Sequence, residues 1–442
     1  MATPPPVTSH DEYRPRYVDI GINLADPIFR GISHGSRRHP DDLGAVISRA
    51  NEVGCSKLIV TGSDFQSCRD ALAIAKEYPG NVYTTIGIHP CSSAIFSTAD
   101  ANHDAMHSNP DPETPMPDTN GPDAEKTETI IADLAALIES TRASQPGSLV
   151  AFGEFGLDYD RLHYASKAVQ LYAFAAQLDL VLATKPQLPL FLHSRAAHED
   201  FRRLLQEKFG PGLEKLERGG VVHSFTGSIE EARELMDLGL YIGINGCSFK
   251  TAENCEVVKQ ISLDRMMQET DGPWCEIRPS HEGYKLLLEK MPETNGEAAP
   301  ADASKPQPKS KKNQKKEPEI PERWKIVKKE KWQEGAMVKG RNEPCMIERV
   351  AKVVAGIKGV SVEENAVAWR FSRAETLGSV LKILNQEAER HQSLYPGAFV
   401  SPDPAIPDNP NSNAFLTSQP ARHSAAINDT SLHELAHAGK DV

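Results

Sequence analysis

The sequence predicts an α/β protein in which eight strands alternate with helices. Eight short runs of apolar and β-branched residues recur along the chain, and helical patterns lie between them. The composition supports a large folded core, because 39% of the 442 residues are hydrophobic and 25% are charged. A chain of this kind forms either a closed barrel or an open, doubly wound sheet.

The eight runs indicate strands because each run is nearly continuous in apolar residues rather than alternating. Continuous patterns are typical of strands that are buried on both faces, as in parallel sheets. The predicted strands are, in chain order, 17–23, 56–62, 82–90, 148–156, 188–194, 220–227, 241–246 and 266–272.

Helical patterns follow most of these runs. One begins with Asp41 and Asp42, and acidic residues suit a helix N-terminus. Another begins at Ser228, which forms a capping box with Glu231 at the third helical position. The remaining predicted helices are 65–78, 129–141, 165–183, 198–209 and 345–357.

Four reactive side chains decide between the two architectures. Glu154, His193, His223 and Asp271 each lie at or near the C-terminal end of a different run. In an open sheet these ends would be spread along a line, whereas in a barrel they converge on one face, where active sites are found. The sequence therefore predicts a (β/α)8 TIM barrel.

These four side chains also predict a metal centre. Two imidazoles and two carboxylates suit Zn²⁺, Mn²⁺ or Co²⁺, and the carboxylates suit Mg²⁺. We expect Asp271 and Glu154 to take part in catalysis, with Asp271 accepting the proton of the attacking water. The alternative is that each group is a hydrogen-bonded core residue. We favour the metal because buried carboxylates are costly without a cation.

Five further polar residues are candidate contacts for substrate phosphate, although a structural role is about as good an interpretation for each. They are His89, Arg195, Ser224, Thr226 and Arg341. His89 could instead close the turn at Pro90, and Glu343 could hold Arg341 in place.

Several segments depart from globular composition. Residues 97–128 have almost no large apolar side chains, and 292–335 are rich in Pro, Ala and Lys, so both are expected to be flexible, low-complexity insertions. Residues 1–16 and the tail 391–442 are expected to be flexible or disordered termini. The lysine-rich run 305–316 is interpreted as a solvated linker or, alternatively, as a nuclear address or nucleic-acid tether.

Other classes of protein are disfavoured. No stretch approaches the ~20 apolar residues of a membrane span, and the first residues lack the apolar core of a secretory signal. The seven scattered cysteines contain no CxxC pair, which excludes a disulfide scaffold and a Cys₄ zinc module. The net charge of −12 argues against wholesale electrostatic binding of nucleic acid, although a bound metal or a basic patch reverses the sign locally.

Seven motifs, in order, are similar to those of the TatD family of metal-dependent deoxyribonucleases. They lie at 19–31, 87–90, 153–161, 190–195, 222–228, 269–274 and 339–345. The resemblance implies a TIM-barrel domain over about 17–390 that hydrolyses DNA phosphodiester bonds with a divalent metal, usually as a 3′→5′ exonuclease. It also implies that the ligand positions of the fourth, fifth, sixth and eighth strands are Glu154, His193, His223 and Asp271.

The first strand departs from the wider family pattern. Many members end this strand with His-x-His, whereas this chain has Gly21-Ile22-Asn23 after Asp19, as in the DIG-x-N branch. Asp19 and Asn23 are therefore positions of open role. With fewer nitrogen ligands, the site is expected to favour Mg²⁺ over Mn²⁺ or Zn²⁺ and to hold one or two ions.

The expected activity is that of a deoxyribonuclease acting on single-stranded or frayed DNA ends. Two alternatives stay open: hydrolysis of an ester or amide such as an aminoacyl-tRNA bond, and a catalytically weak barrel that only binds nucleic acid. We expect a monomer without a membrane partner, in the cytoplasm, the nucleus or both.

Overall fold

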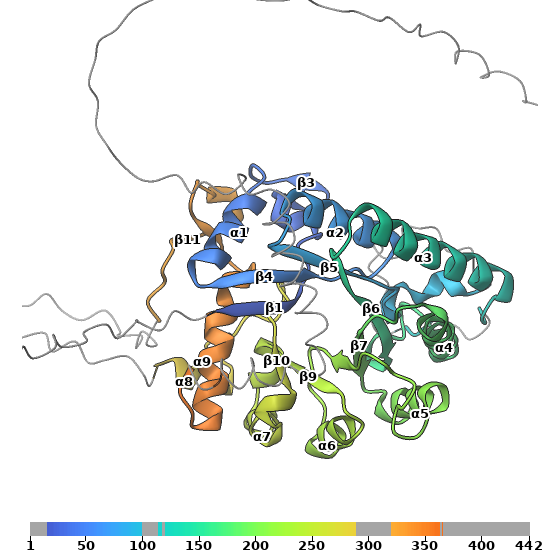
Figure 1. The fold of residues 1–442 in the computed structure, drawn as a ribbon. Coiled ribbons are helices and arrows are strands. Elements are labelled where there is room, and N and C mark those ends of the chain that lie inside the picture. Colours follow the sequence, from blue (N-terminus) through green and yellow to red (C-terminus); the bar gives the residue numbers. More distant parts are fainter. Residues whose placement is uncertain (1–15, 100–113, 117–119, 289–319, 363–364, 366–442) are drawn as a thin grey trace, which may run out of the picture. The chain divides into compact units, whose positions relative to one another are not determined.

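The computed structural model describes residues 16–99, 114–116, 120–288, 320–362 and 365. Its main sheet has eight strands in the order β1-β4-β5-β6-β7-β8-β9-β10, and all neighbouring strands are parallel (Figure 1). The first and last strands meet through the residues that follow them, since the Asp271 N–H donates to the Gly21 carbonyl at 2.9 Å. The Asn23 N–H donates to the Gly272 carbonyl at 2.9 Å. The predicted (β/α)8 barrel is confirmed.

All eight predicted strands are present, mostly shorter than the apolar runs because the runs continue into buried connecting loops. The strands are β1 Tyr17–Ile22, β4 Cys55–Val60, β5 Val82–Ile86, β6 Leu149–Asp158, β7 Leu190–Arg195, β8 Gly220–Val222, β9 Tyr241–Ile244 and β10 Met266–Gln268. Two short pairs lie outside the barrel: β2 Ile32–Ser33 with β3 Ser36–Arg37, and β11 Ile326–Val327 with β12 Met337–Val338.

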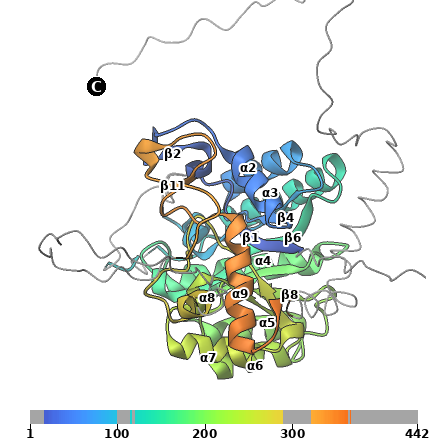
Figure 2. The same ribbon diagram turned by 90° about the vertical axis from the view of Figure 1, so that its left-hand side faces the viewer.

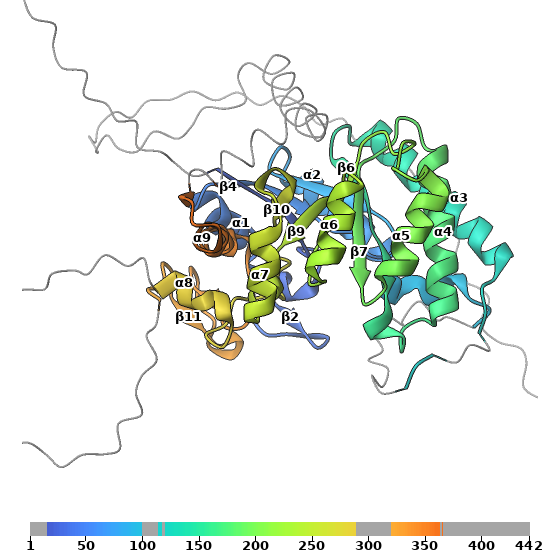
Figure 3. The same ribbon diagram turned by 90° about the horizontal axis from the view of Figure 1, so that it is seen from below.

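Helices surround the strands, and α3 to α7 are arranged around the barrel in the order of the chain (Figures 1 and 3). They are α1 Leu43–Glu52, α2 Phe65–Glu77, α3 Ala124–Ser144, α4 Lys167–Ala183, α5 His198–Phe209, α6 Ile229–Asp237, α7 Ala252–Gln260, α8 Lys285–Leu288 and α9 Ile347–Lys358. The capping box of Ser228 and Glu231 at the start of α6 is present. Helix α9 packs beside α7 and α8 (Figure 2).

The strands are apolar on both faces because one face of each strand points into the barrel and the other packs against the surrounding helices. Inside the barrel, one small cluster combines residues of six strands: Val18, Ile20, Ala151, Phe191, Val221, Tyr241 and Met267. Outside, the strands pack on the helices, for example where Phe155 contacts Phe174 and Phe174 stacks on Phe201, each at a ring distance of 5.4 Å. Burial on both faces thus explains the continuous apolar runs.

The expectation that 97–128 is flexible throughout is wrong at its C-terminal end. Helix α3 already begins at Ala124, and the Asp123 carboxylate caps it by accepting from the Lys126 N–H at 3.1 Å. Helical propensity and a capping residue outweigh the polar composition of this segment. The residues 100–113 and 117–119 lie outside the described part of the chain.

The expectation for 292–335 is likewise wrong for its last sixteen residues. The Trp332 ring stacks on His39 at 5.3 Å, and Trp324 Nε1 donates to Glu52 at 3.3 Å. Two tryptophans provide the apolar anchor that the surrounding Pro, Ala and Lys residues lack. The lysine-rich run 305–316 and the tail 391–442 lie outside the described residues. In the part that is described, no helix has the length and apolarity needed to cross a membrane.

Candidate metal centre

The C-terminal ends of the strands bring the predicted ligands to one face of the barrel. Glu154 lies in β6 and His193 in β7, while His223 directly follows β8 and Asp271 lies three residues after β10. His89 follows β5 and joins the same group. Apart from the half-buried Asp271, these side chains are buried. The barrel thus collects in space five residues that are 182 positions apart at the extremes of the sequence, from His89 to Asp271.

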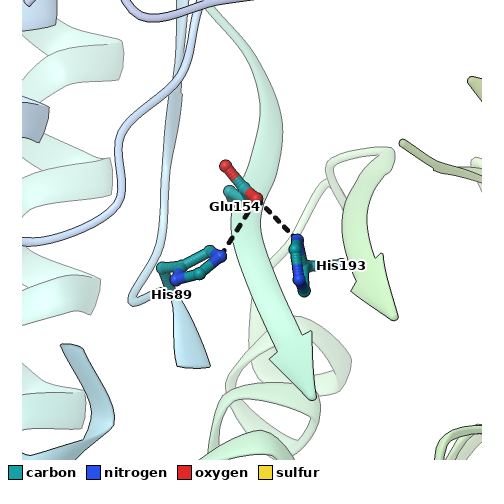
Figure 4. Close-up of side chains that lie close together, drawn as sticks. All are labelled: His89, Glu154 and His193. Atoms are coloured by element: carbon teal, nitrogen blue, oxygen red, sulfur yellow. Dashed lines mark hydrogen bonds and ion pairs between the residues drawn. The ribbon is translucent and has the colours of Figure 1, made fainter. Parts of the chain in front are cut away.

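Three ring nitrogens meet at one oxygen of Glu154. His223 Nε2 lies 2.5 Å from Glu154 Oε1, His193 Nδ1 lies at 3.0 Å and His89 Nε2 at 3.2 Å. Figure 4 shows His89 and His193 pointing at this oxygen from opposite sides. The atoms offered by His89, Glu154 and His193 all lie within 4.8 Å of one another. Imidazole nitrogens gathered around a carboxylate are the donor set of a borderline divalent ion.

The electrostatics of this cluster also fit a cation. Burial raises the pKa of Glu154, but the positive charges of His223 and His89 lower it well below its ordinary value. Burial lowers the pKa of His89, but the negative charge of Glu154 outweighs this effect and raises the pKa to about 10. The same charge raises the pKa of His223 well above its ordinary value. The buried carboxylate of Glu154 thus favours positive charge at this position, and a divalent ion supplies such charge.

Asp158 contacts the His193 ring on the side away from Glu154 and holds it in position. Its Oδ2 lies 3.2 Å from His193 Nε2, so the Nδ1 of the same ring is the atom left for a metal. Asp158 also caps the short turn after β6 by accepting from the Asp160 N–H at 3.1 Å. Asp158 thus both orients His193 and caps the turn.

Asp271 lies beside the histidine cluster, among groups that donate hydrogen bonds to its carboxylate. Its Oδ1 accepts from Asn23 Nδ2 at 3.0 Å, and its Oδ2 accepts from Ser224 Oγ at 3.3 Å and from the Cys275 thiol at 3.2 Å. Burial raises the pKa of Asp271, the charge of His223 lowers it, and the negative charge of Glu269 raises it again. The resulting pKa of Asp271 is about 7. A carboxylate with this pKa is suited to exchange protons near neutral pH.

The two first-strand positions have different surroundings. Asn23 orients Asp271 and in turn accepts from Thr61 Oγ1 at 2.5 Å. Asp19 is fully buried and accepts from both the backbone N–H and the hydroxyl of Thr270. Burial raises the pKa of Asp19 to about 8. Asp19 therefore ties β1 to the segment after β10, behind the candidate metal centre.

Glu269 is a residue of the site that the sequence analysis missed. It is fully buried, and its Oε1 accepts from the Ser224 N–H at 2.5 Å and from Asn245 Nδ2 at 3.3 Å. Its Oε2 lies 3.6 Å from His223 Nδ1, and neither atom has a hydrogen bond within the described residues. The signal was present: Glu269 precedes Asp271 by two residues, and such spacing places side chains on the same face of an extended segment.

The candidate phosphate contacts differ in their surroundings. His89 serves in the cluster through Nε2 and also closes its own turn, where Nδ1 accepts from the Cys91 N–H at 3.0 Å. Ser224 is buried and bonds Asp271 and Asn245. Arg195 and Thr226 are half-buried, and Arg195 Nε has no hydrogen bond among the described residues.

Arg341 does not reach the site. Its guanidinium is 2% exposed and donates to Asp42 and Glu343 at 2.6 and 2.9 Å. Glu343 also accepts from Arg49 Nε at 2.8 Å. All four charged groups are buried, and the network ties the segment before α9 to the start of α1. The expectation that Arg341 contacts phosphate is therefore corrected, because its charge is already neutralised inside the fold. Glu343 holds Arg341 in place, as the alternative interpretation proposed.

Comparisons with known proteins agree with this geometry. The family model described as TatD related DNase matches residues 18–370. "Deoxyribonuclease Tat-D" of Schizosaccharomyces pombe is 43% identical over 350 residues, which are 79% of this chain and 91% of that protein. "3'-5' ssDNA/RNA exonuclease TatD" of a Pantoea species is 33% identical over 266 residues, 60% of this chain and 82% of that protein.

A solved structure extends the agreement to three dimensions. It is described as an uncharacterized amidohydrolase from Saccharomyces cerevisiae and has 32% sequence identity and a TM-score of 0.65. The match covers 82% of this chain and 99% of that one. With the strand-end ligands, the barrel and the family model in agreement, this chain belongs to the TatD related DNase family.

Proposed function

We propose that this chain is a divalent-metal-dependent deoxyribonuclease that shortens single-stranded DNA from an end. The observation that supports the metal site most directly is the meeting of three imidazole nitrogens at Glu154 Oε1. Family membership supports the reaction, and the printed name of the Pantoea relative supports exonuclease action. The ion would be held by His89, Glu154, His193, His223 and Asp271.

The donor set favours Mn²⁺ or Zn²⁺ for the histidine cluster. The preference for Mg²⁺ expected from the sequence depended on the missing first-strand histidines, but His89 supplies a third imidazole nitrogen. Nitrogen-rich sites suit borderline ions, whereas Mg²⁺ prefers oxygen ligands. Asp271 offers carboxylate oxygens, with Asn23 Nδ2 holding Oδ1 in position at 3.0 Å, and would suit Mg²⁺ as a second ion.

The side chains around the ion have separate tasks in phosphodiester hydrolysis. A divalent ion held there would supply Lewis-acid polarisation of a phosphoryl oxygen. Asp271 would accept the proton of the attacking water, and Asn23 and Ser224 keep its carboxylate in position. Arg195 ends β7 two residues after His193, and its half-buried guanidinium would donate to a phosphate oxygen.

Trp274 is a proposed platform for a DNA base. Its side chain is 56% exposed, although it lies only three residues after Asp271. Exposed aromatic side chains near a cleavage site stack on unpaired bases, which favours single strands over duplex. The Asn342 side chain fixes the backbone of this residue by donating to the Trp274 carbonyl at 2.8 Å.

A nuclease assay on end-labelled single-stranded DNA tests the proposal. Purified protein is compared in EDTA, Mg²⁺, Mn²⁺ and Zn²⁺, beside His193→Ala and Asp271→Asn. We expect stepwise shortening that needs a metal and is lost in both variants. Efficient cutting of a covalently closed circle would contradict exonuclease action. No cutting with any ion, but release of an amino acid from an aminoacyl ester, would move the substrate to the ester and amide class.

The oligomeric state and the location in the cell are proposed with their own tests. We propose that the chain is a monomer, and light scattering at several concentrations would show a constant mass near 48.5 kDa. We also propose a location in the cytoplasm, the nucleus or both. Deleting the lysine-rich run 305–316 should shift a fluorescent fusion toward the cytoplasm if the run is a nuclear address, and an unchanged distribution would support the solvated linker.

A further inference from the structure

Two cysteines from different loops face each other at the rim of the candidate metal centre. Cys247 lies in the short 3-10 helix Gly246–Phe249 after β9, and Cys275 lies in the segment that follows β10. Their sulfur atoms are 2.9 Å apart. Both side chains are half-buried, so a small reagent can reach them. The seven cysteines are all free thiols in the structure.

The backbones around the pair are close enough for a covalent bond. A Cβ atom at Gly246 would overlap the carbonyl oxygen of Cys275, so the two loops touch at the residue next to Cys247. A disulfide needs a sulfur–sulfur distance of about 2.05 Å and Cα atoms within roughly 7 Å. Starting from 2.9 Å, the sulfurs must approach by less than about 1 Å, which side-chain rotation and small loop shifts can supply.

The two thiols are also chemically unequal. The contact with Cys275, with the positive charges of Lys250 and Arg195 nearby, lowers the pKa of Cys247 to about 6 in spite of its partial burial. The Cys275 thiol keeps its hydrogen, which it donates to Asp271 Oδ2 at 3.2 Å. A thiolate beside a retained thiol is the arrangement of an attacking and a resolving cysteine.

We propose that Cys247 and Cys275 are a redox site that forms a reversible intramolecular disulfide when the protein meets a peroxide. The Cys247 thiolate attacks one peroxide oxygen, and the oxygen–oxygen bond breaks to give a sulfenic acid and hydroxide. The Cys275 sulfur then displaces the sulfenic oxygen, which leaves as water with the Cys275 proton, and the hydroxide takes up the proton that Cys247 released when it formed the thiolate. In sum, two thiols and one hydrogen peroxide give one disulfide and two waters.

The bond would act on the site through Asp271. The Cys275 thiol donates to Asp271 Oδ2 at 3.2 Å, and a disulfide sulfur has no hydrogen to donate. Oxidation would therefore leave this oxygen with the Ser224 hydroxyl at 3.3 Å and would draw the segment containing Trp274 toward β9. We expect lower nuclease activity in the oxidised protein. This consequence rests on the proposed nuclease function, whereas the formation of the bond does not.

Peptide mass mapping tests the bond without any activity measurement. The full chain is treated with hydrogen peroxide, alkylated and digested, beside Cys247→Ser, Cys275→Ser and the control Cys255→Ser, which removes another half-buried thiol. We expect a crosslinked peptide of Cys247 and Cys275 that disappears on reduction, is absent from the first two variants and persists in the control. Sulfinic acid at Cys247 with Cys275 still open to alkylation would overturn the proposal.

The consequence for activity has its own outcomes. Wild type and Cys255→Ser should lose activity with the appearance of the crosslinked peptide and regain it on reduction, and Cys247→Ser should resist the loss. A crosslink that forms while activity stays constant would overturn the effect on Asp271. If the reduced wild type shows no nuclease activity at all, the proposed function fails, and the crosslink still decides whether the redox site exists.

Discussion

Glu269 fills the space next to Gly21, a first-strand position at which this chain has no side chain. A Cβ atom at Gly21 would lie 2.5 Å from Glu269 Oε2, and Glu269 in turn approaches His223 Nδ1 at 3.6 Å. The glycine is therefore a steric requirement of this carboxylate. The missing histidines are replaced by a buried acid that reaches the cluster from the opposite end of the sheet.

Gly21→Ala should displace Glu269 and destabilise the protein by about 1–3 kcal/mol, the usual cost of overpacking a buried site. Urea unfolding measures this change, and metal titration should show weaker binding through His223. Gly121→Ala is the matched control, because a Cβ there meets nothing within 4 Å. Equal stabilities of the two variants would show that Glu269 is not confined by Gly21.

Glu269→Gln should move the acidic limb of the activity profile to lower pH. A general base is active when it is deprotonated, so the rate rises as the pH passes the pKa of Asp271. The Glu269 charge raises that pKa, and removing the charge lowers it. The dependence of kcat/KM on pH measures the shift. A limb that stays in place, or moves to higher pH, would argue against Asp271 as the base.

Asp158→Asn should weaken metal binding by roughly 10- to 100-fold, the usual effect of losing a residue that orients a ligand. The Asp158 carboxylate lies 3.2 Å from His193 Nε2 and keeps Nδ1 directed at the cluster. Calorimetric titration with Mn²⁺ measures the affinity. Asp160→Asn changes an exposed acid two residues away and should bind the ion as wild type does. Unchanged affinity in Asp158→Asn would remove this residue from the site.

Trp274→Ala should raise KM for single-stranded DNA more than it lowers kcat. Base stacking on an aromatic side chain contributes about 1–3 kcal/mol, which corresponds to roughly 5- to 150-fold in affinity. Tyr172→Ala is the control, since this exposed aromatic lies on α4. Fluorescence anisotropy with an inactive background, Asp271→Asn, isolates binding. Equal binding with and without the indole would contradict a stacking role.

Arg341→Ala should destabilise the fold by about 3–5 kcal/mol, because it leaves the buried Asp42 and Glu343 without their partner. The fraction that stays folded should bind DNA as wild type does. Arg323→Ala, which removes an exposed partner of Glu348, should change stability by less than about 1 kcal/mol. A stable Arg341→Ala protein with weakened DNA binding would restore the phosphate contact that the structure contradicts.

The sequence determined the barrel and most of the candidate ligands. Strands buried on both faces must be continuously apolar, so the eight runs were visible without any tertiary information. Glu154, His193, His223 and Asp271 were equally visible, because polar residues that end such runs fall on the catalytic face of a barrel. The segments before α3 and before β11 were predicted less well, since a helix cap and two anchoring tryptophans are weak signals within polar, low-complexity sequence.

Only the tertiary structure decided how the remaining side chains meet. Closure of the barrel brings Gly21 of β1 against Glu269 after β10, and it brings His89 and His193 to one oxygen of Glu154. It also buries the ion pair of Arg341 and Asp42, which are 299 residues apart along the chain. Contacts between residues so far apart depend on the packing of whole elements, so a local pattern of residue types contains no information about them.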